Sequence, residues 1–269
     1  MVSSAVRKSR LNGLLALVIA GSLLLAGSAR ADEIKVMTSG SFTAAYLELV
    51  PEFERLSHHK VVTTFGASMG NAPDSIPVRL SRGEPVDVVI LVGSALEDLV
   101  AQGKVVKTSR VDLARSSIGM AVRAGAPKPD ISSVEALRQT LLQAKSIAYS
   151  ASASGVYVST ELFQRLGIAD QVKSKAKRIE SERVGAVVAR GDAEIGFQQV
   201  SELLPIKGID YVGPLPAEVQ RVSLVSAGIA TGSKAPDAAR ALIEFLASPA
   251  AVAAIKRNWL EPNTNLNTN

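Results

Sequence analysis

A chain of 269 residues can form one large domain or two lobes that each bury a core, and it is too long for a single small domain. It contains no cysteine, which excludes disulfides, thiol chemistry and cysteine-ligated metal sites. The formal net charge of +5 falls to about +1 without the basic leader described next, and this balance excludes a nucleic-acid-binding function.

The first 31 residues have the pattern of a secretory signal peptide. Arg7, Lys8 and Arg10 precede an apolar run at 14–27 that is short for a membrane span, and a small-x-small cleavage pattern ends at Ala31. We therefore expect cleavage after Ala31, export to the periplasm and a soluble mature protein. The alternative is an uncleaved membrane anchor.

After the leader, short β-rich runs alternate with helical patterns, which favours parallel sheets covered by helices. The first expected elements are a strand at 33–40, a helix at 43–56, a strand at 60–66, a broken helix at 71–82, a strand at 86–91 and a helix at 96–102. The strand at 86–91 is apolar enough to be buried on both faces. Pro51 is expected to bend or split its helix.

A segment at 116–130, punctuated by Gly and Pro, predicts a strand, a turn and a crossing into a second lobe. The elements that follow are helix 134–144, strand 146–150, helices 156–166 and 184–190, strand 193–199, a proline-rich loop at 211–220, strand 221–230 and helices 236–247 and 249–257. The predicted fold class is α/β. Residues 32–116 plus 222–269 would form lobe 1, and residues 117–221 would form lobe 2.

Four loops follow strands and enter helices, the place where open α/β sheets bind ligands. They read "TSGSFTAA" at 38–45, "FGASMGN" at 65–71, "SASASG" at 150–155 and "ESERVGAVV" at 180–188. Each offers backbone N–H groups at a helix start together with hydroxyl donors, an arrangement that binds an anion without a buried counter-charge. The alternative for each loop is an ordinary helix N-cap.

Longer runs of the sequence carry a family resemblance. In order and spacing, "IKVMTSGSFTAAYLELVPEFE", "VVTTFGASMG", "RGEPVDVVIL", "SGVYVSTELFQRLGI" and "RVGAVVARGDAEIGF" resemble the periplasmic molybdate-binding proteins of ABC transporters, over nearly the whole mature chain. The resemblance implies a two-lobed type II periplasmic binding protein. Each lobe would be a mainly parallel sheet flanked by helices, hinged around a central cleft in which hydroxyls and backbone amides grip an oxyanion.

The resemblance also implies site residues. Ser41 and Ser68 match the two serines of the family's first lobe, whereas Ser154, just before Gly155, and Val184 stand where the family offers backbone amides. With the neighbouring polar groups, the expected ligand-binding set is Ser39, Ser41, Ser68, Ser152, Ser154, Gly155, Arg183, Val184, Gln198 and Gln199.

One departure from the family bears on the ligand. Gln199 or its neighbour Gln198 stands where molybdate binders commonly carry a Tyr. Amide side chains both donate and accept hydrogen bonds, which suits an organic di- or tricarboxylate better than a small symmetric oxyanion such as molybdate. Arg183 could add a two-pronged clamp on a carboxylate, although a surface position on an exposed helix explains it equally well.

An enzyme of the same fold is the second hypothesis, because the chain also resembles the aconitate isomerases, which interconvert cis- and trans-aconitate. That reaction needs one group to remove and return a proton beside a carboxylate-activated alkene. The candidates are Tyr46, Tyr149, Tyr157, Glu182 and the pair His58 and His59. None is marked by a motif, so the catalytic residue stays unknown.

The favoured prediction is a periplasmic solute-binding protein that captures a small anion for ABC-type uptake. Its partners would be that ligand and an ABC permease, which recognises the closed state. We expect a monomer without a cofactor. No metal site is expected either, because the side chains of the adjacent His58 and His59 point to opposite sides of an extended segment.

Overall fold

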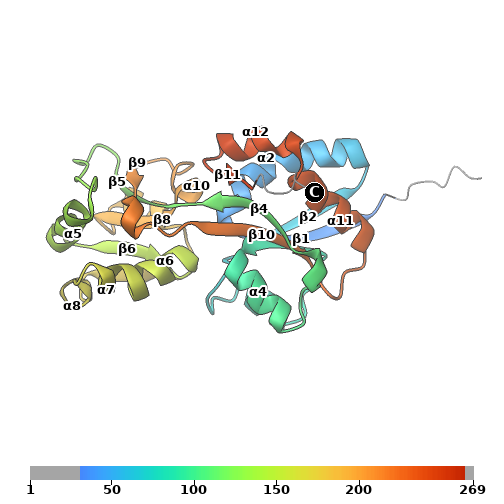
Figure 1. Cartoon of the computed structure of the whole chain (residues 1–269), viewed down its shortest axis with the longest axis horizontal. Helices are drawn as coiled ribbons and strands as arrows, with labels where there is room; N and C mark the ends of the chain where they lie inside the picture. The colour runs from blue at the N-terminus through green and yellow to red at the C-terminus, as the bar shows by residue number, and fades with distance from the viewer. Residues whose placement is uncertain (1–30, 264–269) are drawn as a thin grey trace, which may run out of the picture. The chain divides into compact units, whose positions relative to one another are not determined.

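The computed structural model describes residues 31–263, whose strands form two separate sheets (Figure 1). The predicted signal peptide lies outside the described residues, apart from Ala31 at its end. Below, the first lobe means the six-stranded sheet with its helices, and the second lobe means the five-stranded sheet with its helices.

The six-stranded sheet has the order β11-β4-β10-β3-β1-β2. Strand β1 pairs in parallel with β2 and β3, whereas β10 runs antiparallel between β3 and β4. The strands are β1 (Glu33–Thr38), β2 (Lys60–Phe65), β3 (Val88–Val92), β4 (Val111–Ser116), β10 (Ser223–Ile229) and β11 (Glu261–Pro262).

Helices cover both faces of this sheet, as the apolar run at 86–91 predicts. Val88 and Ile90 of β3 belong to the core shared with α2 (Gly40–Ser57), α11 (Pro236–Leu246) and α12 (Val252–Arg257). Val89 and Leu91 belong to the core shared with α3 (Ile76–Ser81) and α4 (Gly93–Ala101) on the other face. All five residues of β3 are buried, so the strand has no solvent-facing side.

The five-stranded sheet has the order β7-β6-β8-β5-β9. Strand β6 pairs in parallel with β7 and β8, and β5 pairs antiparallel with β8 and β9. The strands are β5 (Ile118–Arg123), β6 (Ile147–Ser150), β7 (Ala176–Ile179), β8 (Ile195–Gln199) and β9 (Ile209–Pro214).

Helices also flank the second sheet. On one face lie α5 (Val134–Gln143), α8 (Ala169–Val172) and one long helical segment made of α6 (Ala153–Tyr157), a π-helical stretch (Val158–Leu162) and α7 (Phe163–Arg165). Helix α9 (Val184–Arg190) packs with Ala148 and Ile179 in a separate core cluster. The short helix α10 (Val200–Leu203) follows β8 directly.

The predicted α/β fold of the two-lobed binding-protein type is confirmed, with sheets that are mixed rather than mainly parallel. The antiparallel pairings come from the strands at the crossings between the sheets. Only Ser117 separates β4 from β5, and the chain returns after β9 to begin β10 at Ser223. Strands β4 and β5 carry the chain from the first sheet into the second, and β9 and β10 carry it back. The outgoing and returning strands run in opposite directions, so β4 pairs antiparallel with β10, and β5 pairs antiparallel with β9.

Pro51 does not split its helix, because α2 runs from Gly40 to Ser57 with Pro51 inside. A proline lacks the N–H that would bond to the carbonyl four residues earlier. Here that carbonyl belongs to Leu47, and both residues are exposed, so water can satisfy the carbonyl. The packing of its buried face therefore keeps the helix continuous.

Four strands were not predicted. Strand β4 and strand β7 lie in stretches with many charged side chains, β9 lies in a stretch predicted as a proline-rich loop, and β11 has only two residues. Pro214 is tolerated because it is the last residue of β9, at the edge of the sheet, where a missing N–H costs no interior hydrogen bond. The broken helix predicted at 71–82 shortens to α3.

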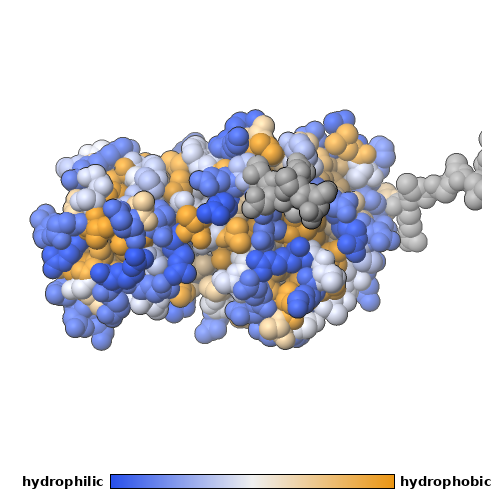
Figure 2. Space-filling view, in the orientation of Figure 1, coloured by the Kyte–Doolittle hydropathy of each residue, from blue (hydrophilic) through white to orange (hydrophobic). Residues whose placement is uncertain are grey.

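The face drawn in Figure 2 intersperses hydrophilic and hydrophobic side chains over both lobes. Among the described residues, no single helix is long and apolar enough to cross a membrane. One bent pair, α11 with the segment Pro249–Arg257, reaches the required length and composition, and residues of both helices belong to the first lobe's core.

Candidate functional site

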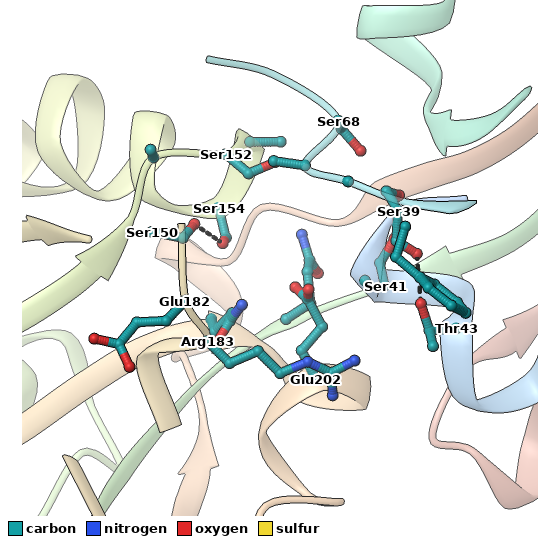
Figure 3. Close-up of a pocket in the computed structure, with 18 of the residues that line it drawn as sticks. Ser39, Ser41, Thr43, Ser68, Ser150, Ser152, Ser154, Glu182, Arg183 and Glu202 are labelled. Atoms are coloured by element: carbon teal, nitrogen blue, oxygen red, sulfur yellow. Dashed lines mark hydrogen bonds between the residues drawn. The ribbon is translucent and has the colours of Figure 1, made fainter. Parts of the chain in front are cut away.

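A cavity of about 420 Å³ with many hydroxyl and charged side chains lies where the two lobes meet (Figure 3). It is lined from the first lobe by residues at or just after the ends of β1, β2 and β3, and from the second lobe by residues at or just after the ends of β6, β7 and β8. The expectation that ligand-binding groups gather at the carboxyl ends of the strands therefore agrees with the position of this cavity. Figure 3 shows the serines of the two lobes on opposite sides of it.

The start of α2 forms much of the first-lobe wall. Ser39 and Ser41 are buried, and their Oγ atoms lie 3.5 Å apart. Ser39 occupies the N-cap position but its side chain makes no capping hydrogen bond. The hydroxyls and the first N–H groups of this 18-residue helix therefore remain available as donors at its positive end.

Ser133 shows what an ordinary cap looks like in the same molecule. Its Oγ accepts a hydrogen bond of 3.1 Å from the backbone N–H of Ala136 in the first turn of α5. Neither Ser39 at α2 nor Ser152 at α6 makes such a bond. The N-cap alternative thus holds for a helix away from the cavity and does not describe the two serines that line it.

Ser68 completes the first-lobe wall from the loop after β2. Its buried Oγ accepts a hydrogen bond of 3.1 Å from the N–H of Val92, the residue that ends β3. This bond ties the loop to the sheet. A hydroxyl that accepts a bond still has its own proton to donate, so Ser68 can serve as a fixed donor toward the cavity.

The second-lobe wall begins with the serine-rich loop after β6. Ser150 Oγ and Ser154 Oγ lie 3.1 Å apart, and Ser152 stands at the start of α6. Gly155 does not line the cavity. Instead, a Cβ at this position would lie 1.6 Å from the carbonyl oxygen of Ser150, so the glycine allows α6 to pack directly on the end of β6.

Val184, also predicted to bind the ligand, is not part of the cavity lining. Its backbone N–H donates a hydrogen bond of 2.9 Å to Oε1 of the buried Gln198. Because a backbone N–H can only donate, this bond fixes the orientation of the Gln198 amide, so that its NH₂ group points away from Val184. The backbone N–H of Val184 therefore positions the side chain of Gln198, which does line the cavity.

Gln199 lies where the lobes are joined. Its Oε1 accepts a hydrogen bond of 2.7 Å from Ser116 Oγ at the end of β4, and its Nε2 lies 3.4 Å from Ser223 Oγ at the start of β10. Gln199 thus contacts both segments that cross between the sheets as well as the cavity.

Eight of the ten predicted ligand-binding residues line the cavity, and Gly155 and Val184 are the two that do not. Arg183 is among the eight, half-buried at the start of α9 with its guanidinium directed toward the centre of the view in Figure 3. Gly155 and Val184 lie behind the residues that line the cavity. Gly155 lets α6 pack against Ser150, and the N–H of Val184 orients the side chain of Gln198.

Glu202 of α10 is a cavity residue that the sequence analysis missed. Its Oε1 approaches the start of α2 so closely that a Cβ at Gly40 would lie 1.8 Å from it. Burial raises the pKa of Glu202 to about 7, while the charge of Arg183 and a hydrogen bond from Gln198 act in the opposite direction. The strand-end rule could have found this residue, since it follows β8 by three positions.

Two other acidic residues of the second-lobe wall are paired with arginines outside the cavity. Glu180 lies 3.1 Å from Arg178, and Glu182 accepts hydrogen bonds of 2.8 and 3.0 Å from Arg190. The Arg190 guanidinium holds the pKa of Glu182 below its usual range. In Figure 3 the Glu182 carboxylate points away from the labelled serines.

The tyrosines and histidines considered as proton carriers do not line the cavity. Tyr46 is buried with its hydroxyl 2.7 Å from Thr63 Oγ1, and burial raises the pKa of Tyr46 to about 12. Tyr157 donates to the carbonyl of Val219 at 2.6 Å. His59 Nδ1 accepts from the N–H of Asp32 at 3.1 Å, near the opposite end of β1.

The two lobes also touch beside the cavity. Ser201 of α10 donates a hydrogen bond of 2.7 Å from its buried Oγ to the carbonyl of Ser41 in α2. Within residues 31–263, no group of three or more His, Asp or Glu side chains is arranged to hold a metal ion.

Comparisons with known proteins agree over nearly the whole length. A family model described as bacterial extracellular solute-binding protein matches residues 34–260. An aconitate isomerase from a Pseudomonas species is 49% identical over 247 residues, covering 92% of this chain and 94% of that protein. The molybdate-binding protein ModA of Azotobacter vinelandii is 29% identical over 250 residues, covering 89% and 94%.

Solved structures share the fold at low sequence identity. The periplasmic molybdate-binding protein of Azotobacter vinelandii matches with a TM-score of 0.67 and 22% identity, over 84% of this chain and 98% of that one. A sulfate-binding protein of Mycobacterium tuberculosis matches with a TM-score of 0.70 and 19% identity, over 87% and 88%. The chain therefore belongs to the bacterial extracellular solute-binding proteins, among the members that resemble the molybdate binders.

Proposed function

We propose that this chain is a periplasmic isomerase that closes its lobes over aconitate and interconverts the cis and trans forms. The observation that carries the proposal is the polar cavity itself, in which serine hydroxyls from both lobes face one another beside a single arginine. The 49% identity to an aconitate isomerase, over nearly the full length of both chains, supports this substrate.

The size of the cavity favours an organic ligand. A volume of about 420 Å³ falls in the range of small-molecule sites and exceeds what a tetrahedral oxyanion fills. The amide groups of Gln198 and Gln199 add both donors and acceptors. A tricarboxylate would fill more of this volume and could pair with both the donors and the acceptors of the two amides. Molybdate would leave part of the volume empty and some of these groups without a partner.

The charges around the cavity also suit a carboxylate ligand. Arg183 can hold one carboxylate through two parallel hydrogen bonds. The remaining carboxylates would be held by neutral hydroxyls and by the N–H groups at the uncapped helix starts of Ser39 and Ser152. Because Glu180 and Glu182 are paired with arginines outside, their repulsion of an anionic ligand is reduced.

We propose that the lobes move about the two crossings. The moving units would be residues 32–116 with 222–269 and residues 117–221, which meet at Ser117 and near Arg221. Gln199 contacts both crossings and the cavity, so it is suited to link a bound ligand to the hinge. A ligand that touches both lobes stabilises their closed arrangement.

A second candidate is an uptake protein that binds its anion unchanged and presents it to an ABC permease. The family description and the 29% identity to a molybdate-binding protein favour it. Both candidates share the periplasmic location, which the predicted signal peptide and the extracellular family support.

One experiment separates the two candidates. Purified protein is incubated with trans-aconitate in heavy water, and proton NMR follows the cis isomer and the methylene signal. The isomerase is expected to produce the cis isomer and to exchange the methylene proton with solvent. In parallel, thermal unfolding is measured with molybdate, sulfate and trans-aconitate. Stabilisation by an anion without turnover would support the uptake protein and would rule out the isomerase.

A further inference from the structure

We infer that Glu202 takes the proton from the substrate and returns it, and this inference rests on the proposed isomerase function. Among residues 31–263, Glu202 is the acidic residue of the second-lobe wall that is not paired with an arginine outside the cavity. It also lies where both lobes converge, since it extends from α10 of the second lobe to Gly40 at the start of α2 in the first.

The surroundings hold the Glu202 carboxyl in one place. Gly40 leaves the space that the carboxyl occupies, because any Cβ there would overlap Oε1. The Gln198 side chain lies close enough to the carboxyl to lower its pKa. The N–H of Val184 already fixes Oε1 of Gln198, so the NH₂ group is the part of Gln198 that is free to donate toward Glu202. A fixed acid-base group of this kind transfers protons efficiently.

The electrostatic balance suits a group that must both accept and release a proton. Burial raises the pKa of Glu202 to about 7, so both protonation states are populated near neutral pH. The charged groups that line the same cavity are Asp74, Glu180, Glu182 and Arg183. Arg183 favours the ionised form of Glu202, and pairing with Arg178 and Arg190 weakens the effect of Glu180 and Glu182.

The proposed step balances with Glu202 alone as the proton carrier. The ionised carboxylate forms an O–H bond as the C–H bond of the substrate methylene breaks. The electron pair spreads over the three-carbon allylic unit and its conjugated carboxylates, where Arg183 and the hydroxyl donors can stabilise it. Glu202 then returns the proton to the far end of the allylic unit. The double bond moves, its geometry is set by the bound conformation, and the carboxylate is regenerated.

Glu202→Gln tests the inference, because it keeps the shape of the side chain and removes its acid-base function. We expect kcat for aconitate to fall by about 10³-fold, together with the exchange of the methylene proton. Stabilisation by trans-aconitate in thermal unfolding should remain. Glu202→Asp should recover part of the rate. Glu135→Gln, which neutralises an exposed carboxylate on α5, is the matched control and should leave kcat unchanged.

Gly40→Ala gives an independent test if Glu202→Gln folds poorly. The three atoms nearest to the added methyl all belong to the flexible Glu202 side chain, with Oε1 the closest, so we expect the fold to tolerate the substitution while the carboxyl is displaced. We expect kcat to fall more than tenfold with KM changed less.

The outcomes are distinguishable. If wild-type protein neither isomerises aconitate nor exchanges its proton, the proposed function fails. If wild-type protein is active and Glu202→Gln keeps its rate within about threefold of it, Glu202 is not the proton carrier and the proposed function stands. A loss of turnover in Asp74→Asn with an active Glu202→Gln variant would transfer the role to Asp74, the remaining carboxylate at the cavity.

Discussion

The two walls of the cavity are built from different chemical groups. The first-lobe wall presents the hydroxyls of Ser39, Ser41 and Ser68, held by a helix start and by a bond to the sheet. The second-lobe wall repeats the hydroxyls but adds Arg183 and Glu202. The first-lobe wall also carries the carboxylate of Asp74, but the arginine and the carboxyl with the raised pKa both belong to the second-lobe wall. Under the proposed function, recognition would be shared between the lobes and the proton transfer would belong to the second.

Gly155→Ala is expected to have the largest effect, and it tests whether the second-lobe wall depends on a close backbone contact. The new Cβ would meet the carbonyl of Ser150 at 1.6 Å, and backbone cannot move aside as a flexible side chain does. We expect a loss of about 3 kcal/mol in the free energy of unfolding, measured by urea denaturation. Gly40→Ala on the first-lobe wall is the matched comparison and should cost much less. Equal losses would show that the backbone contact is not special.

Glu202→Gln should change how stability depends on pH. The pKa of Glu202 is raised in the folded protein from 4.5 to about 7, so its neutral form favours folding. That contribution is present below the unfolded pKa and is lost as pH rises through about 7. The glutamine variant should therefore gain on the order of 2 kcal/mol relative to wild type between pH 4 and pH 8.

Urea denaturation of both proteins at the two pH values measures this difference, because the other titrating groups cancel. A difference that is independent of pH would mean that the Glu202 carboxyl is ionised normally. Glu202 would then add an ordinary negative charge to the second-lobe wall, beside the charges of Glu180, Glu182 and Arg183, instead of a titrating group.

Arg183→Gln tests whether the charge of the second-lobe wall contributes more to affinity than a hydroxyl of the first. We expect the Kd for trans-aconitate to rise by roughly tenfold, or about 1.4 kcal/mol, because a charge-assisted pair is lost. Ser41→Ala should raise the Kd less. Isothermal titration of both variants measures the two losses. A larger loss for Ser41→Ala would reverse the proposed division between the walls.

The smallest expected effect is a difference in unfolding free energy between two serine variants, Ser133→Ala and Ser39→Ala. Ser133 caps α5 through the N–H of Ala136, so its removal should cost about 1 kcal/mol of unfolding free energy. Ser39 makes no capping bond with its side chain, so Ser39→Ala should leave stability nearly unchanged and weaken ligand binding instead. Thermal unfolding with and without trans-aconitate separates the two effects. If Ser39→Ala destabilises the protein as much as Ser133→Ala, Ser39 is a cap after all.

The sequence predicted the parts of the fold and site that follow from local patterns. The strand at 86–91 is buried on both faces because its apolar residues alternate between two sets of helices. The serine loops line the cavity because loops at the carboxyl ends of neighbouring strands meet at one edge of a sheet. These predictions needed no knowledge of distant contacts.

The features that the sequence did not reveal depend on contacts between distant segments. Glu202 sits in "VSEL", where a single acid after a short helix start looks like a solvated side chain, whereas in the fold its carboxyl reaches Gly40 of the other lobe and the side chain of Gln198. Val184 keeps its backbone amide for Gln198, fourteen residues away. Strand β9 contains Gly213 and Pro214, which predict a loop unless the strand is known to lie at an edge.

The hydrogen bond from Ser201 to the carbonyl of Ser41 joins the lobes without passing through the cavity. If the lobes close over a ligand as proposed, this bond would supply part of the free energy of closing and the ligand would supply the remainder. A closed form that is already populated without ligand would lower the conformational cost of binding and so tighten the apparent affinity. It would also reduce the difference in shape between ligand-bound and ligand-free protein, which an uptake partner would have to detect and an enzyme would not.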